Sequence, residues 1–118
     1  MQQQVYIVSA ARTAIGGFNG ALRDVPLPTL GAHVIREALR RAAAEAGEVD
    51  EVILGTVMQA GHEICPARVA ALEAGVPEAV PAYSINKACG SGLKAVALGA
   101  QSIRVGEAEM VLAGAWRA

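Results

Sequence analysis

The sequence predicts an α/β fold in which a mostly parallel sheet is built from alternating strands and helices, in the order βαβαβαβ. Four short apolar runs of strand type alternate with three longer segments of helical periodicity, which is the pattern of consecutive βαβ crossovers. The composition agrees, because 53% of the residues are hydrophobic, only 3% are aromatic, and alanine supplies 25 of the 118 residues. Small apolar side chains suit helices packed closely on a sheet. The length corresponds to a single domain, residues 1–118.

The first strand is expected at Val5–Ala10, where an apolar, β-branched run indicates a strand covered on both faces. Residues 12–24 contain three glycines and an asparagine, and we expect them to form a loop. Thr29 can cap the first helix, in which apolar residues recur at helical spacing from Leu30 to Ala46. Gly47 is suited to end it.

The remaining elements continue the alternation. Further strands are expected at 49–58, 82–86 and 109–115, and further helices at 66–74 and 90–105. Pro66 fits the first turn of its helix, and Gly75 and Gly106 end the two helices.

The helix expected at 90–105 is apolar around most of its circumference. Lys94 and Arg104 are its only charged residues, whereas a helix on the surface of a domain has one polar face. A four-stranded sheet can cover only one side of such a helix. We therefore expect a further layer on the other side, supplied by a partner chain or by a second half of the fold.

Composition and charge exclude several classes of protein. Ten Lys and Arg residues against eleven Asp and Glu give a net charge of −1, so no basic surface for nucleic acid is indicated. The apolar content excludes intrinsic disorder, and the longest stretches without a charged residue, at 11 residues, are too short to span a bilayer. Met1–Gln4 carries no positive charge before the first apolar run, unlike a signal peptide. We expect a cytoplasmic protein with neither nucleic acid nor membrane as a partner.

The cysteines and histidines are not spaced like metal ligands. Cys65 and Cys89 stand 24 residues apart without a Cys-x-x-Cys pair, and His33 and His62 are far from each other. A metal site is therefore not expected, and neither is a disulfide in a reducing compartment. We interpret Cys65 as a structural thiol and both histidines as surface or structural residues.

Cys89 stands between an expected strand and an expected helix, in the turn Cys-Gly-Ser-Gly. The first N–H groups of a helix have no intrahelical acceptor and the helix dipole favours negative charge there, so both stabilise a thiolate. Gly90 and Gly92 permit close approach of a substrate, and free N–H groups could hold a developing oxyanion. The alternatives are an inert packing thiol and a phosphate cradle, although the cradle lacks the Walker and Gly-x-Gly-x-x-Gly spacings.

The run from Ser84 to Val96 (SINKACGSGLKAV) closely resembles the acyl-accepting cysteine segment of the thiolase family, the acetyl-CoA acetyltransferases. Residues 9–20 resemble the opening strand and loop of the family, and residues 55–61 with 66–68 resemble its second strand and following helix. The likeness extends from Val5 to about Gly114.

The resemblance implies a thiolase-like half fold. In the family, two similar halves pack their central helices between two sheets to give five layers, and this chain matches the first half only. It implies that Cys89 takes the acyl group of an acyl-CoA as a thioester, for Claisen condensation or for thiolysis of a 3-ketoacyl-CoA. Coenzyme A thioesters are then substrates, no separate cofactor is needed, and a homo-oligomer is expected.

The match ends before the other catalytic groups of the family. Its activating histidine and second cysteine come from the C-terminal half, and after Gly114 this chain continues Ala115-Trp116-Arg117-Ala118. We therefore expect a truncated thiolase portion that is inactive by itself. Two alternatives remain open: a ketoacyl-synthase-type or hydroxymethylglutaryl-CoA-synthase-type member of the same superfamily, and a non-catalytic module that associates through its apolar helix.

Overall fold

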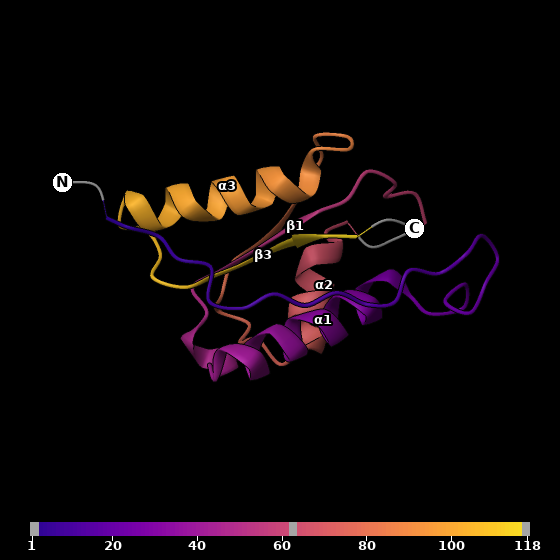
Figure 1. Cartoon of the computed structure of the whole chain (residues 1–118), viewed down its shortest axis with the longest axis horizontal. Coiled ribbons are helices and arrows are strands. Elements are labelled where there is room, and N and C mark those ends of the chain that lie inside the picture. Colours follow the sequence, from indigo (N-terminus) through magenta and orange to yellow (C-terminus); the bar gives the residue numbers. More distant parts are fainter. Residues whose placement is uncertain (1–2, 62–63, 117–118) are drawn as a thin grey trace.

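The computed structural model describes residues 3–61 and 64–116, and it is an α/β protein with helices on both faces of a small sheet (Figure 1). One helix, α3, covers one face, and α1 and α2 lie together on the other. The predicted α/β class is confirmed. In chain order the elements are α1 (Leu27–Ala42), the 3₁₀ helix η1 (Ala46–Glu48), β1 (Glu51–Gly55), α2 (Pro66–Glu73), β2 (Ala82–Ile85), α3 (Ser91–Arg104) and β3 (Val111–Ala115).

The sheet is parallel throughout, with the strand order β2-β1-β3. β1 is the central strand: Val52 is aligned with Ala82 of β2 on one side and with Leu112 of β3 on the other. Val52 and Ile53 are completely buried, as expected of a strand covered by helices on both faces. All three strands end at the same edge, which is where the loops can build a site.

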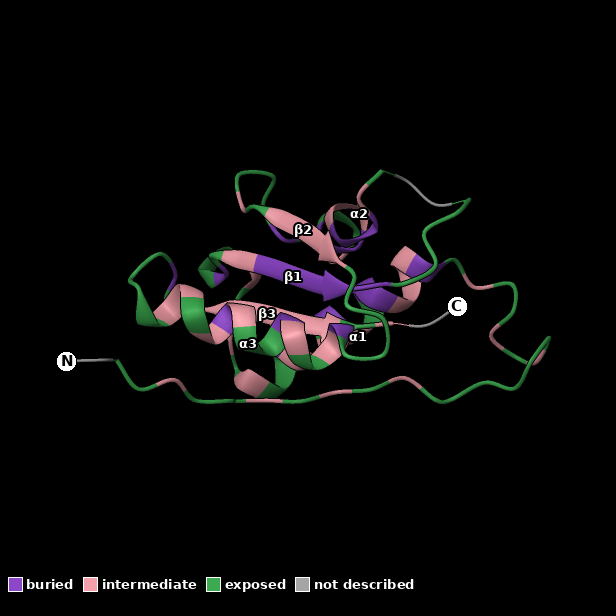
Figure 2. Ribbon diagram, turned by 90° about the horizontal axis from the view of Figure 1, so that it is seen from above, coloured by how far each residue is buried: buried purple, intermediate pink, exposed green. Residues whose placement is uncertain are grey.

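The strand predicted at Val5–Ala10 is not part of this sheet. The segment is extended and runs beyond the β3 edge in the same direction as β3 (Figures 1 and 2), yet among the described residues it makes no backbone hydrogen bond to a strand. Tyr6, Ile7 and Val8 are 72%, 80% and 69% exposed. The apolar, β-branched pattern gave the extended conformation correctly, but a strand also needs a partner, which this pattern does not specify.

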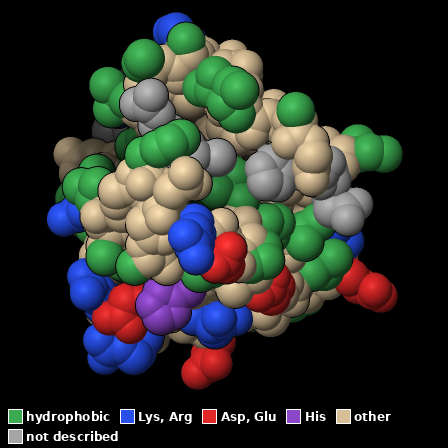
Figure 3. All heavy atoms as spheres, turned by 90° about the vertical axis from the view of Figure 1, so that its right-hand side faces the viewer, with side chains coloured by type: hydrophobic (Ala, Val, Ile, Leu, Met, Phe, Trp, Pro, Cys, Tyr) green, Lys and Arg blue, Asp and Glu red, His purple; other side chains and the backbone are tan. Residues whose placement is uncertain are grey.

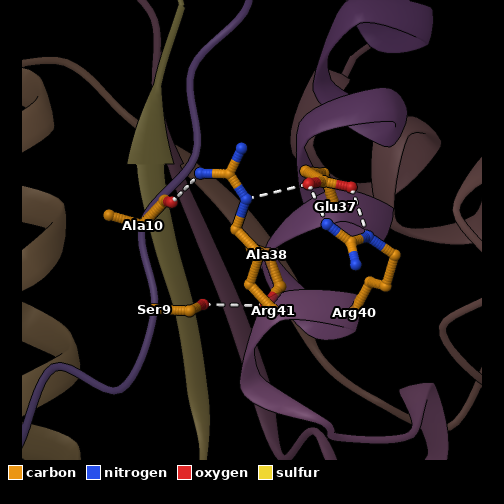
Figure 4. Close-up of polar contacts among 6 residues, drawn as sticks. All are labelled: Ser9, Ala10, Glu37, Ala38, Arg40 and Arg41. Atoms are coloured by element: carbon orange, nitrogen blue, oxygen red, sulfur yellow. Dashed lines mark hydrogen bonds and ion pairs between the residues drawn. The ribbon is translucent and has the colours of Figure 1, made fainter.

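Contacts with α1 hold the segment instead (Figure 4). The Ser9 hydroxyl donates to the Ala38 carbonyl at 2.8 Å, and the Arg41 guanidinium donates to the Ala10 carbonyl at 2.7 Å. Arg41 also donates to the Glu37 carboxylate at 2.8 Å, so one side chain joins the segment to an ion pair on the helix.

Several element boundaries differ from the predicted ones. The first helix begins at Leu27 rather than after Thr29, with Pro26 as its N-cap, and it ends at Ala42 because Ala43 adopts a left-handed conformation with φ of 53°. The strand predicted at 49–58 is confined to β1, since Gly55 is its last residue aligned with both neighbouring strands. The helix predicted at 66–74 is confirmed within one residue.

α3 lies against β1 and β3 through small residues (Figure 2). A Cβ on Gly92 would lie 3.2 Å from the Cβ of Ala115, and one on Gly99 would lie 3.0 Å from Cγ1 of Val111, so these glycines let the helix approach the sheet closely. The opposite face of α3 is open in the described structure, where Leu93 is 78% exposed. The sheet thus covers one side of this helix, as predicted, and the further layer stays a prediction.

The surface is divided between charged and apolar regions. Figure 3 faces the ends of the strands and shows charged side chains gathered at the lower edge, on the side of α1 and α2, with hydrophobic side chains spread above them. Within residues 3–61 and 64–116, no helix has the length and apolar character that crossing a bilayer requires.

Candidate active site

Cys89 lies in an exposed turn between β2 and α3, at the edge of the sheet where all three strands end. Residues 86–90 are exposed, and the chain becomes buried at Ser91, the first residue of α3. In parallel α/β sheets, the crevice outside the carboxyl ends of the strands is where ligands bind. The predicted position of Cys89 at a strand-to-helix junction is confirmed.

The turn has an unusual backbone that is held by side chains. Ala88 adopts a left-handed conformation with φ of 47°, which is uncommon for a residue other than glycine. The Asn86 carboxamide oxygen accepts the Ala88 N–H at 2.9 Å, and the Ser91 hydroxyl donates to the Ala88 carbonyl at 2.7 Å. Both polar groups of the residue before Cys89 are therefore satisfied by neighbouring side chains.

Some backbone N–H groups of the turn already donate hydrogen bonds within it. Fewer of them are therefore available to hold an oxyanion than the sequence predicted. The Gly90 N–H donates to the Lys87 carbonyl at 3.0 Å, and the Ser91 N–H donates to the Ala88 carbonyl at 3.2 Å. Across the part of the chain that the structure describes, the Cys89 N–H has no acceptor. The Gly92 and Leu93 N–H groups likewise have no acceptor among these residues, so the N–H groups available to an oxyanion are those of Cys89 and of the first turn of α3.

An open hollow of about 320 Å³ lies next to the turn, on the outward side of α3. Gly90, Leu93 and Ala97 give it apolar walls, and Lys87 and Lys94 supply its charged groups. Cys89 is not one of the residues that line this hollow, which lies beside the turn rather than at the thiol.

The other residues singled out in the sequence lie elsewhere. Cys65 is the N-cap residue of α2 and is half-buried, with its sulfur 3.7 Å from both the Ala82 carbonyl and the Ser84 hydroxyl. His33 is exposed on α1, across the sheet from α3. His62 lies outside the described residues. Cys65 and His33 are thus on elements of the opposite layer from Cys89, and the structural interpretation of Cys65 stays a prediction.

Sequence reasoning missed the contribution of Ser91 and Gly55. Ser91 is 4% exposed and hydrogen bonded to the turn, and Gly55 at the end of β1 leaves no room for a side chain beside it. A serine at the first position of a helix was a visible signal, but its partners lie on the preceding turn rather than within the helix. The Gly55 contact joins residues 36 positions apart and leaves no local pattern.

The described residues thus form a parallel α/β sheet with an exposed, free cysteine at a strand-to-helix turn. Residues 5–116 match the family model described as "Thiolase, N-terminal domain". The chain belongs to the thiolase family, which decides against the ketoacyl-synthase-type alternative.

The names of similar proteins are consistent with this family. The chain is 57% identical over 112 residues to a protein of Pseudomonas aeruginosa named acetyl-CoA acetyltransferase, covering 95% of this chain and 28% of that protein. It is also 57% identical over 110 residues to an acetyl-CoA acetyltransferase of Cupriavidus necator, covering 93% of this chain and 28% of the relative. A probable acetyl-CoA acyltransferase of Staphylococcus epidermidis is 50% identical over 111 residues, which are 94% of this chain and 28% of that protein. The chain thus spans little more than a quarter of the length of these relatives.

Proposed function

We propose that this chain carries the acyl-accepting nucleophile of a thiolase-type acyltransferase, and that the nucleophile is Cys89. The observation that carries the proposal is the exposed thiol on a turn at the edge where the strands end, directly before the buried start of α3. The names of the relatives support an acyl-CoA as the substrate.

The proposed reaction has two covalent steps. The Cys89 thiolate attacks the carbonyl carbon of an acyl-CoA, the bond from that carbon to the coenzyme A sulfur breaks, and the departing thiolate takes a proton. The acyl group is then held on Cys89 as a thioester. A second acetyl-CoA, after losing a proton from its methyl carbon to a base, forms a carbon–carbon bond to that acyl carbon, and the Cys89 thiolate departs. Thiolysis of a 3-ketoacyl-CoA is the reverse sequence.

The described residues contribute the nucleophile and its immediate surroundings. The Cys89 N–H is available to the oxygen that becomes negative when the thioester carbon is attacked. The start of α3 adds the positive end of the helix dipole, which favours that oxyanion.

A base for Cys89 is not supplied by His33, because α1 and α3 lie on opposite faces of the sheet. We therefore expect that the 118-residue chain does not catalyse thiolysis by itself. Removing a general base lowers the rate by roughly 10²–10⁴-fold. The assay is thiolysis of acetoacetyl-CoA by the purified chain. Robust turnover that is abolished by Cys89→Ala would contradict this expectation.

A chimera tests Cys89 itself. Residues 5–116 replace the matching segment of the Pseudomonas aeruginosa relative, and acetoacetyl-CoA thiolysis is measured together with mass spectrometry of the acylated enzyme. We expect thiolysis and a single acyl group on Cys89, both lost in Cys89→Ala. The matched control is Cys65→Ala, which removes the half-buried thiol of the opposite layer and should leave thiolysis unchanged. Activity that survives Cys89→Ala would refute the proposal.

A second candidate function is association through α3, favoured by the open outward face that carries the exposed Leu93. Gel filtration of the chain separates the two: a dimer or a mixture of oligomers favours association, and a clean monomer argues against it. A homo-oligomer of the whole enzyme and a cytoplasmic location stay predictions.

A further inference from the structure

Ser91 ties together the turn that presents Cys89. Its hydroxyl accepts the Lys87 N–H at 2.8 Å and donates to the Ala88 carbonyl at 2.7 Å. One hydroxyl group therefore joins the Asn86–Lys87 peptide group to the Ala88–Cys89 peptide group, across the two residues before the cysteine. Ser91 is 4% exposed, so its hydroxyl is largely shielded from water, whereas both partner residues lie in the exposed turn.

The Ser91 hydroxyl holds Ala88 in a backbone conformation that is unfavourable without such a contact. Ala88 has φ of 47°, a left-handed conformation disfavoured for a residue with a Cβ, and such residues persist where surrounding contacts fix them. The second contact on Ala88 comes from Asn86, whose side chain is exposed and competes with water. The hydrogen bond from Ser91 is partly buried and is therefore the stronger restraint.

The sheet in turn fixes Ser91. Gly55 ends β1 directly beneath it, and a Cβ on Gly55 would lie 2.6 Å from the Ser91 Cβ. The position of Cys89 thus depends on a short series of contacts, from the end of the central strand through Ser91 to the backbone of Ala88.

We propose that Ser91 is a positioning residue for the acyl-accepting thiol: through the Lys87 and Ala88 peptide groups, it fixes the direction of the Cys89 side chain and of its N–H. Both hydrogen bonds of its hydroxyl go to the backbone of the turn. The inference rests on the proposed function of Cys89, but its effect on the thiol can be measured without any acyl transfer.

The first test is Ser91→Ala in the 118-residue chain, with the rate of Cys89 alkylation by iodoacetamide measured at one fixed pH. We expect alkylation to slow by about two- to tenfold, the factor corresponding to one hydrogen bond of ordinary net strength. Cys65 in the same molecule is the internal control. Ser102→Ala is the matched variant, because Ser102 is a half-buried serine on the same helix whose hydroxyl bonds to no described residue.

A measurement on the unmodified chain keeps the inference testable if Ser91→Ala does not fold. Amide hydrogen exchange should show the Lys87 N–H protected to a degree similar to the interior of α3, although Lys87 lies in an exposed turn. Exchange as fast as in the loop at 12–24 would overturn the inference. An unchanged rate of Cys89 alkylation in a folded Ser91→Ala chain would overturn it as well.

The chimera separates this inference from the proposed function. There, Ser91→Ala should lower kcat by a similar factor and leave KM for acetoacetyl-CoA nearly unchanged, and Ser91→Thr, which keeps the hydroxyl, should recover part of the loss. Activity that persists in Cys89→Ala would refute the proposed function but not the effect of Ser91 on alkylation. Equal kcat for Ser91→Ala and the parent chimera would refute the positioning role.

Discussion

Replacing Gly55 by alanine tests the contact between the central strand and the helix that follows Cys89. The added methyl carbon would lie 2.6 Å from the Ser91 Cβ and 2.8 Å from the Ser91 carbonyl carbon. Non-bonded carbon atoms pack at about 3.5–4.0 Å, so the first turn of α3 must retreat from β1 by about 1 Å. Because one of the two close atoms is backbone, no change of rotamer can relieve the overlap.

The expected loss of stability follows from the cost of overpacking, about 1–3 kcal/mol. An unfolding entropy of about 2.1 cal/mol/K per residue over 118 residues converts this to a Tm lower by roughly 4–12 °C. Differential scanning calorimetry measures Tm, and iodoacetamide labelling of Cys89 reports the displacement of the turn. Gly47→Ala is the control, because nothing lies within 4 Å of a Cβ built there. If Gly55→Ala matched Gly47→Ala in Tm and in Cys89 labelling, the close contact between β1 and α3 would be disproved.

Two further predictions concern the other helices. Hydrogen bonds from Arg40 and Arg41 lower the pKa of Glu37 from 4.5 to about 2, so its stabilising contribution is complete above about pH 4.5 and is lost as the pH falls toward 2. Urea midpoints in an acidic series should therefore fall less steeply for Glu37→Gln than for the parent chain, and identical slopes would exclude this ion pair as a contributor. On α3, Leu93→Lys should leave the urea midpoint nearly unchanged, because Leu93 is 78% exposed, and should shift gel filtration toward monomer if the open face drives association. An unaltered oligomer distribution would locate association elsewhere.

The sequence was sufficient to predict the elements whose signals are local. Helical spacing and Pro66 located α2 to within one residue, and the turn glycines with the apolar helix placed Cys89 at the start of α3. The N-terminal run shows the limit of such reasoning. Its residues predicted an extended segment, but its contacts with Ala38 and Arg41 of α1 are 29 and 31 residues away and leave no periodic pattern.

The supporting contacts of the candidate site were beyond sequence reasoning for a related reason. Whether Gly55 meets Ser91 depends on how closely α3 crosses the end of β1, and that distance is set by the whole sheet. Likewise, a serine at the start of a helix ordinarily caps the helix's own N–H groups, whereas Ser91 bonds backward to Lys87 and Ala88.

The central position of β1 has a consequence for how the chain is made. Both neighbours of this strand follow it in sequence, and Val52 is sixty positions away from its partner Leu112. During synthesis, β1 therefore leaves the ribosome before either of the strands that pair with its two edges. The part of the sheet on which α3 packs forms only after β3 has been made. Such late, long-range pairing slows folding and prolongs exposure of apolar edges.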